Sequence, residues 1–190
     1  MIVLEGLAAL SPFRRDRLET RLRQLAPSIS VQGAWHIYFL EPESGQVLDT
    51  PAIGRILEGC PANEPLTNGA QSVFVTPRLG TLSPWASKAT EILRGAGHKV
   101  VRVERGLRLD IGGMPETSSE LFTKLRKSLF DPMTQSLLLS RDEAEQLFTH
   151  LPAGPLQHIA MAHLPEANLR LGLALSPDEK TIYITNDMYV

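Results

Sequence analysis

The sequence predicts an α+β protein made of two similar halves, in which helices cover antiparallel strands. Two observations predict this fold class. Strand and helix signals alternate over the first 140 residues, and the pattern of residues 1–70 returns in residues 71–140. The composition agrees: the 190-residue chain is 43% hydrophobic and 21% charged, which excludes a disordered, collagen-like or coiled-coil protein.

The first half begins with a short apolar strand, Ile2–Leu4, followed by a helix. Ser11 is a good N-cap for that helix because its hydroxyl accepts a hydrogen bond from a free backbone N–H, and Pro12 loses no needed donor at the first helical position. Gly33 marks a predicted hairpin turn. The other elements expected here are the hairpin arms Ile29–Val31 and Trp35–Leu40, a helix from about Thr50 to Glu58, and a connector over Cys60–Ala70.

The second half repeats this order. Val73–Val75 predicts a strand, Ser83 and Pro84 begin a helix, and Gly95 and Gly97 end it. Gly106 marks a second predicted hairpin turn. The other elements expected here are the hairpin arms Val100–Glu104 and Leu107–Ile111, a helix over Ser118–Leu129, and a closing strand over Gln135–Leu139.

Short matches at a constant offset connect the two halves. Leu10-Ser11-Pro12-Phe13 returns as Leu82-Ser83-Pro84-Trp85 after 72 residues, and Gly33 returns as Gly106 after 73. These matches predict a duplication with halves at about residues 1–70 and 71–140. Each half has the ferredoxin-like order β-α-β-β-α-β. Two such halves either join their sheets or pack face to face as a pseudo-dimer covered by helices.

The stretch from Val75 to Thr90 carries the main candidate site. It consists of a strand, a polar glycine loop and a helix N-terminus, where free N–H groups and the helix dipole favour an anion. The candidate residues are Arg78, Gly80, Thr81, Ser83, Trp85, Ser87, Lys88 and Thr90. Polar residues around an aromatic anchor also suit a contact with another domain. A purely structural interpretation, in which Gly80 turns, Ser83 caps and Trp85 packs, stays open.

Other chemistry-bearing residues give weaker signals. Cys60 is the single cysteine, which excludes an internal disulfide and a multi-cysteine zinc site. A nucleophilic cysteine needs a base beside it, so we interpret Cys60 as a small filler or an exposed connector residue. His158 and His163 are five residues apart, which does not match the spacing of a helical metal pair, and no metal site is predicted.

The first predicted helix carries a basic stripe, formed by Arg14, Arg17 and Arg21. Such a face is usually solvated, and an acidic surface of another domain is the alternative partner. Glu19 and Arg23 are expected to pair at i, i+4. The net charge is −2, so no nucleic-acid partner is predicted, and no apolar run is long enough to span a membrane. With one cysteine and no secretion signal, a cytoplasmic location is expected.

Several segments together resemble the N-terminal domain of large phosphoribosylformylglycinamidine synthase, an ATP-dependent, glutamine-using ligase of purine biosynthesis. The resemblance covers residues 1–179. The segments that carry it are Leu4-Glu5-Gly6, Leu10 to Arg14, Thr76-Pro77-Arg78, Ser83-Pro84-Trp85, Ser87 to Thr90, Glu104-Arg105-Gly106, Ala167 to Leu175 and Asp178-Glu179.

The resemblance implies an architectural role. In that family the N-terminal domain is a duplicated version of a small subunit and helps to join the synthase core to the glutaminase domain. Residues for ATP, magnesium and formylglycinamide ribonucleotide lie in later domains, as does the glutaminase Cys-His-Glu set. No catalytic, cofactor-binding or metal residue is therefore expected in this chain, which also lacks the G-x-x-x-x-G-K-[ST] and G-x-G-x-x-G phosphate loops. The expected partners are synthase and glutaminase domains, in cis or in trans, and the chain alone is expected to be inactive.

The end of the chain departs from this resemblance. Residues 141–179 read as a connector towards a linker domain, and Ser176 to Glu179 form a good helix start. A β-branched, alternating segment, Lys180–Thr185, follows instead of a helix. We therefore expect residues 180–190 to be an atypical tail that results from a frameshift, a truncation or a foreign sequence. Two other hypotheses are a stand-alone scaffold subunit of a multi-subunit synthase and an unrelated anion-binding module.

Overall fold

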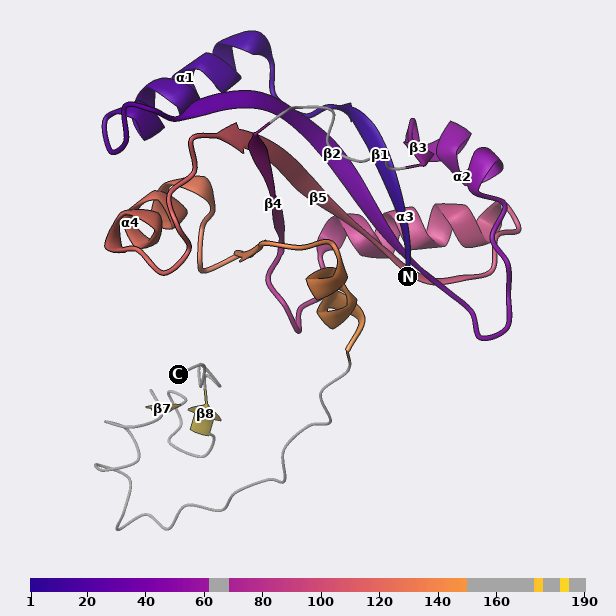
Figure 1. Ribbon diagram of the computed structural model, residues 1–190. Helices are drawn as coiled ribbons and strands as arrows, with labels where there is room; N and C mark the ends of the chain where they lie inside the picture. The colour runs from indigo at the N-terminus through magenta and orange to yellow at the C-terminus, as the bar shows by residue number, and fades with distance from the viewer. Residues whose placement is uncertain (62–68, 150–172, 176–181, 185–190) are drawn as a thin grey trace. The chain divides into compact units, whose positions relative to one another are not determined.

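The computed structural model describes residues 1–61, 69–149, 173–175 and 182–184 (Figure 1). The chain divides into two compact units, Met1–Leu151 and Pro152–Val190. In the second unit the described residues form two short antiparallel strands, β7 (Leu173–Leu175) and β8 (Ile182–Ile184).

The first unit contains one six-stranded sheet with helices, so the α+β prediction is confirmed. All its strand pairs are antiparallel, in the order β3-β1-β2-β5-β4-β6. Its elements are β1 (Ile2–Ala8), α1 (Pro12–Arg23), β2 (Ser30–Pro42), α2 (Thr50–Leu57), β3 (Cys60–Pro61), β4 (Ala70–Pro77), α3 (Pro84–Gly95), β5 (Val100–Gly112), α4 (Glu120–Leu129), β6 (Gln135–Leu138) and the 3-10 helix η1 (Asp142–Phe148).

Both serine N-caps form as the sequence predicts. The Ser11 hydroxyl accepts a hydrogen bond from the Arg14 N–H at 3.4 Å, and the Ser83 hydroxyl accepts one from the Ala86 N–H at 3.0 Å. Each serine precedes a proline at the start of its helix, where the missing proline N–H costs nothing. Local side-chain chemistry therefore determines where α1 and α3 begin.

The two predicted hairpins are wrong. Strands β2 and β5 each run without a break for 13 residues and pair with each other along almost their whole length. Gly33 lies at a shift in the pairing register, where an added Cβ would fall 1.7 Å from the Trp35 ring. At Gly106 an added Cβ would fall 2.9 Å from the Val75 carbonyl oxygen. Both glycines permit close approach within a strand, and neither forms a turn.

The four α-helices among the described residues cover one face of the sheet, in two pairs. Leu22 of α1 and Leu125 of α4 pack over Ala34 and Leu109, whereas α2 and α3 pack around Tyr38, Leu40 and Val103. Side chains along a strand alternate between faces, so the even-numbered positions of β2 after the register shift at Gly33 and the odd-numbered positions of β5 lie on this same face. Figure 1 shows α1 and α4 towards one end of the sheet and α2 and α3 towards the other.

The opposite face of the sheet carries the 3-10 helix. Ile37, Phe39 and Phe74 form an apolar cluster there with Ala144 and Leu147 of η1. These five side chains are buried, with 4% exposure or less. The 3-10 helix η1 thus closes part of this face.

The strand order reads the same from both edges towards the centre. Strands β3, β1 and β2 come from the first half, and β6, β4 and β5 occupy the matching places in the second. Each half has the order β-α-β-α-β. It differs from the predicted ferredoxin-like order because a single long strand, β2 or β5, replaces the two hairpin strands expected between the helices. The central pair, β2 and β5, places Trp35 opposite Arg108, 73 residues apart.

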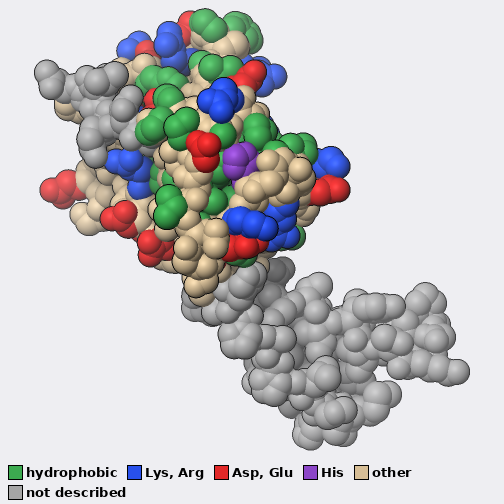
Figure 2. Space-filling model, turned by 90° about the vertical axis from the view of Figure 1, so that its right-hand side faces the viewer, with side chains coloured by type: hydrophobic (Ala, Val, Ile, Leu, Met, Phe, Trp, Pro, Cys, Tyr) green, Lys and Arg blue, Asp and Glu red, His purple; other side chains and the backbone are tan. Residues whose placement is uncertain are grey.

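On the side of α2 and α3, the molecular surface mixes both signs of charge. Figure 2 shows acidic and basic side chains there, interspersed with apolar ones. This face therefore presents no field of one sign to a partner. Among the described residues, no helix is long and apolar enough to cross a membrane.

Candidate functional site

The predicted loop between β4 and α3, together with α3, lies beside a part of the central strand β5 that has no neighbouring strand on that side among the described residues. Pairing of β4 with β5 ends at Val75 and Leu107, so the preceding part of β5 has no strand on that side among the described residues. The hydroxyl of Thr90, a buried residue of α3, accepts a hydrogen bond from the Val103 N–H at 3.0 Å. Helix α3 thus provides a partner that a neighbouring strand would otherwise supply.

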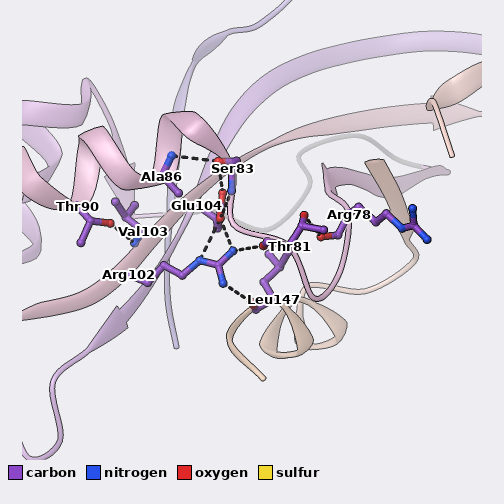
Figure 3. A network of polar contacts seen from close by, with 9 residues as sticks. All are labelled: Arg78, Thr81, Ser83, Ala86, Thr90, Arg102, Val103, Glu104 and Leu147. Atoms are coloured by element: carbon purple, nitrogen blue, oxygen red, sulfur yellow. Dashed lines mark hydrogen bonds and ion pairs between the residues drawn. The ribbon is translucent and has the colours of Figure 1, made fainter. Parts of the chain in front are cut away.

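The N-terminus of α3 already holds an anion from the chain itself. The Glu104 carboxylate accepts a hydrogen bond from the Ser83 hydroxyl at 2.7 Å and one from the Ser83 N–H at 3.3 Å (Figure 3). Glu104 is fully buried, at 0% exposure. A carboxylate beside a helix N-terminus is stabilised by the N–H groups and the helix dipole. The anion predicted for this loop is therefore an internal one.

Arg102 neutralises that buried carboxylate and ties three elements together. Its Nε donates to Glu104 at 3.0 Å, and its Nη2 donates both to Glu104 and to the Thr81 carbonyl. Its Nη1 donates to the Leu147 carbonyl of η1 at 2.9 Å. Figure 3 shows the guanidinium between the loop, the strand and the 3-10 helix. A buried pair with this many hydrogen bonds specifies the arrangement of the elements it joins.

The first loop residues make local turns that hold the loop in place. Gly80 has φ +79, in the left-handed region that favours glycine. The Arg78 carbonyl accepts hydrogen bonds from the Thr81 N–H at 3.1 Å and from the Thr81 hydroxyl at 2.6 Å. The Arg78 N–H donates to the Thr134 carbonyl at 3.0 Å, which connects the loop to the start of β6.

The helical members of the predicted set point elsewhere. Trp85 stacks on Tyr38 with ring centroids 5.8 Å apart, and the Arg105 guanidinium lies 4.9 Å from the Trp85 ring. Ser87 and Lys88 are exposed, and Lys88 pairs with Glu91 at 3.0 Å. The structure thus brings Thr81 and Ser83 together around Glu104, and it places Trp85, Ser87, Lys88 and Thr90 in other surroundings.

Sequence reasoning missed Arg102 as the centre of this network. A signal was present: Arg102 and Glu104 are two residues apart in a strand, so their side chains share a face. The same spacing recurs at Arg108 and Asp110, where the Arg108 Nε donates to the Asp110 carboxylate at 2.9 Å. An arginine followed two residues later by a carboxylate, within an apolar strand, therefore indicates a buried ion pair here.

A second polar feature is a hollow of about 400 Å³ on the helical face, which His36 and Arg105 line. Burial and the positive charge of Arg105 lower the pKa of His36 below its usual value, while a hydrogen bond with the Gly106 backbone acts in the opposite direction. Burial likewise raises the pKa of the Tyr38 phenol, against the effect of Arg105. His36 is therefore neutral near pH 7 and can accept or donate one hydrogen bond.

The loop residues do not fit a nucleotide phosphate or its magnesium ion. The donors at Ser83 and Ala86 already face Glu104 and the Ser83 hydroxyl. No group of three His, Cys, Asp or Glu side chains placed to hold a metal occurs within residues 1–61 and 69–149. Cys60 is exposed. The two histidines considered as a metal pair, His158 and His163, lie outside the described residues.

Comparison with known proteins decides the family. A family model described as formylglycinamide ribonucleotide amidotransferase N-terminal matches residues 35–148, which is more than half of the chain. The chain belongs to this family. The matched region runs from within β2 to the end of η1, so it includes Glu104, Arg102 and the β4–α3 loop. The resemblance to the N-terminal domain of phosphoribosylformylglycinamidine synthase is thereby confirmed, and with it a place in a synthase of purine biosynthesis.

Proposed function

We propose that this chain is a non-catalytic scaffold that joins the synthase and glutaminase parts of its parent enzyme. The observation that carries the proposal is the internal use of the polar groups at the candidate site. Glu104, Arg102 and Ser83 satisfy one another, and Thr90 binds the β5 backbone. Groups that bind one another in this way position a loop and are not free to act as a nucleophile or base at this site.

We also propose that the scaffold is a duplicated unit whose two halves share one sheet. An arginine at the end of the long helix in each half supports this. The Arg23 Nε donates to the Ile29 carbonyl at 2.9 Å, and the Arg94 Nε donates to the Val100 carbonyl at 2.8 Å. The offset is 71 residues in both cases. Each arginine fixes the chain where it enters the long strand that follows.

A second helix-to-strand contact also recurs. The Glu19 carboxylate accepts a hydrogen bond from the Val31 N–H at 2.7 Å, and the Thr90 hydroxyl accepts one from the Val103 N–H at 3.0 Å. The helix residues are again 71 apart and the strand residues are 72 apart. The chemistry of the acceptor differs while its place is kept, which is what duplication followed by divergence produces. The expected i, i+4 pair of Glu19 with Arg23 forms at 2.8 Å and belongs to this contact.

The parent reaction would convert formylglycinamide ribonucleotide, ATP and glutamine into formylglycinamidine ribonucleotide, ADP, phosphate and glutamate. ATP and magnesium would bind in other domains of that enzyme, in the cytoplasm. This chain would supply no reacting group and would act by holding the two catalytic parts together, in cis or as a separate subunit. Ammonia released at one part would then reach the other without escaping into solvent.

Reassembly in trans tests the proposal. A family synthase lacking its own N-terminal domain is mixed with this chain, and glutamine- and ATP-dependent product formation is measured. The chain alone should release no glutamate from glutamine, and adding it to the shortened synthase should restore complex formation and turnover. Glutamine turnover by the chain alone would contradict the non-catalytic role.

A variant with a disturbed loop provides the control. Arg102→Met should lose reassembly because the loop and η1 lose their common partner, whereas Lys88→Gln, which alters an exposed pair on α3, should reassemble like the wild type. Absence of any complex with the wild-type chain would count against the scaffold role. Separate synthase and glutaminase chains that co-purify with it would instead favour a stand-alone subunit.

A further inference from the structure

The groove between α1 and α4 has an apolar floor and a basic rim. It is a hollow of about 380 Å³. Three arginines of α1 stand along it, and leucines from α1, the segment before it, β5 and α4 form the rest. The lining residues are Leu10, Arg14, Arg17, Leu18, Arg21, Leu107, Leu109 and Leu129. No carboxylate is among them, although the chain as a whole has more acidic than basic residues.

The arginines of α1 differ in whether another group of the chain binds their guanidinium. The Arg21 Nη2 donates to the Ser128 carbonyl at 2.6 Å, which fixes α1 to the end of α4. Arg14 and Arg17 are exposed, and among the described residues neither has a carboxylate partner. Their neighbour Arg15, by contrast, pairs with Asp16 at 3.7 Å. Two unneutralised guanidinium groups thus stand beside a hollow lined by leucines.

The same surface continues beyond the groove. Leu10 and Leu107 also line the adjoining hollow of about 400 Å³, which contributes Arg105 and no carboxylate. Phe13 stands one helical turn before Arg17 and is 74% exposed. An exposed aromatic ring and the guanidinium groups of Arg14 and Arg17 thus stand beside apolar floors. The complement of this surface is a chain segment that offers both carboxylates and apolar side chains.

We propose that this groove binds an acidic, amphipathic segment of another part of the same enzyme. The inference rests on the proposed scaffold function and specifies where the scaffold holds its partner. Carboxylates of the segment pair with Arg14 and Arg17, and its apolar side chains cover Leu18, Leu107 and Leu129. A helix that lays one apolar face into a groove between two helices is a common mode of such recognition.

A peptide titration tests the groove directly. The full-length chain, with its leucine methyl groups labelled for NMR, is titrated with a synthetic peptide of about ten residues in which glutamates and leucines share one helical face. Saturable shifts should centre on Leu18, Leu107 and Leu129. The dissociation constant should rise as salt increases, because exposed charges are screened. No saturable shift at these leucines would overturn the inference.

Charge variants separate the acidic partner from other occupants. Arg14→Gln/Arg17→Gln should weaken peptide binding about tenfold, whereas the matched variant Arg15→Gln/Lys88→Gln, with the same net charge, should change it less than about twofold. A peptide with glutamine in place of every glutamate should bind the wild-type chain about as weakly as the original peptide binds the double variant. Equal binding of both peptides, or equal effects of both variants, would overturn the proposed charge selection.

A titration with inorganic phosphate distinguishes a peptide-binding groove from a small-anion site. Phosphate should not shift the groove leucines, and saturable shifts at low millimolar phosphate would mean that the groove is a small-anion site instead. The titration requires no other domain of the enzyme. A failed titration alongside successful reassembly in trans would therefore reject this groove and leave the scaffold function standing. A successful titration without reassembly would support the groove as a peptide-binding site and count against the scaffold function.

Discussion

Glu104 and Ser83, 21 residues apart, close the N-terminus of α3 with a buried carboxylate. The Ser83 hydroxyl both donates to Glu104 at 2.7 Å and accepts from the Ala86 N–H at 3.0 Å, so one serine caps the helix and binds the strand beneath it. Arg102 compensates the charge. The loop that the sequence marks as an anion site is thus a structural joint in which strand, helix and η1 meet.

Loss of the Glu104 charge should strongly destabilise the first unit. In Glu104→Gln the side chain keeps its shape, but Arg102 loses a buried counter-charge, and breaking a buried pair in this way costs about 3 kcal/mol. Urea unfolding followed by circular dichroism measures the loss. Glu91→Gln, which removes the exposed partner of Lys88, should cost no more than about 0.5 kcal/mol. Equal effects of the two substitutions would show that the Arg102 network contributes nothing special.

The two serine caps should differ in strength. Ser83→Ala should cost about 2 kcal/mol, because it removes the cap and leaves a buried Glu104 oxygen without its donor. Ser11→Ala should cost about 0.5 kcal/mol, since Ser11 is exposed and its bond to the Arg14 N–H is long at 3.4 Å. Chemical unfolding of both variants under one set of conditions gives the comparison. A larger loss in the Ser11 variant would contradict it.

The bulge at Gly33 should not accept a side chain. An added Cβ would fall 1.7 Å from the Trp35 ring, so Gly33→Ala should move the indole and cost about 2 kcal/mol. Gly95, in α3, has no atom within 4 Å of an added Cβ. Gly95→Ala should therefore stabilise the protein by about 0.5–1 kcal/mol through its better helix propensity. The midpoint temperature of thermal unfolding should fall for Gly33→Ala and rise for Gly95→Ala.

Acid should weaken the fold through His36. Because the pKa of His36 is lowered in the folded protein, the unfolded chain takes up a proton first as pH falls below about 6.5. Stability is then lost over that range, and none of this loss occurs above it. Arg105→Gln removes a positive charge near the ring, so the pKa of His36 should rise towards 6.5 and the pH dependence should shrink.

NMR titration of the His36 ring, together with urea unfolding at about pH 7.5 and 5.5, measures both effects. A His36→Gln variant serves as the reference, because it has no proton to bind in this range. Wild type and His36→Gln that lose equal stability on acidification would show that another group is responsible. The same outcome would show that the hollow lined by His36 and Arg105 does not contribute to the pH dependence of stability.

Local chemistry in the sequence was enough to place most helices and strands. Ser11 and Ser83 predicted the starts of α1 and α3, since an N-cap depends only on residues within one turn. The repeat of Leu-Ser-Pro-aromatic, 72 residues on, marks the starts of two helices that each follow a strand, although the predicted ferredoxin-like order within each half differs from the observed β-α-β-α-β. The hairpins at Gly33 and Gly106 failed because a glycine in an apolar run marks a turn or a close approach equally well, and only the neighbouring strand distinguishes them.

The sequence by itself determined the fold class, the family and the absence of recognisable catalytic motifs, because periodicity, capping and motif spacing are properties of neighbouring residues. The tertiary structure decided what the candidate loop does. Ser83 meets Glu104 only because β5 extends past the end of β4, and Arg102 reaches Leu147 only because η1 returns to the opposite face of the sheet. Such contacts depend on strand register and chain reversal over tens of residues, which no local pattern encodes.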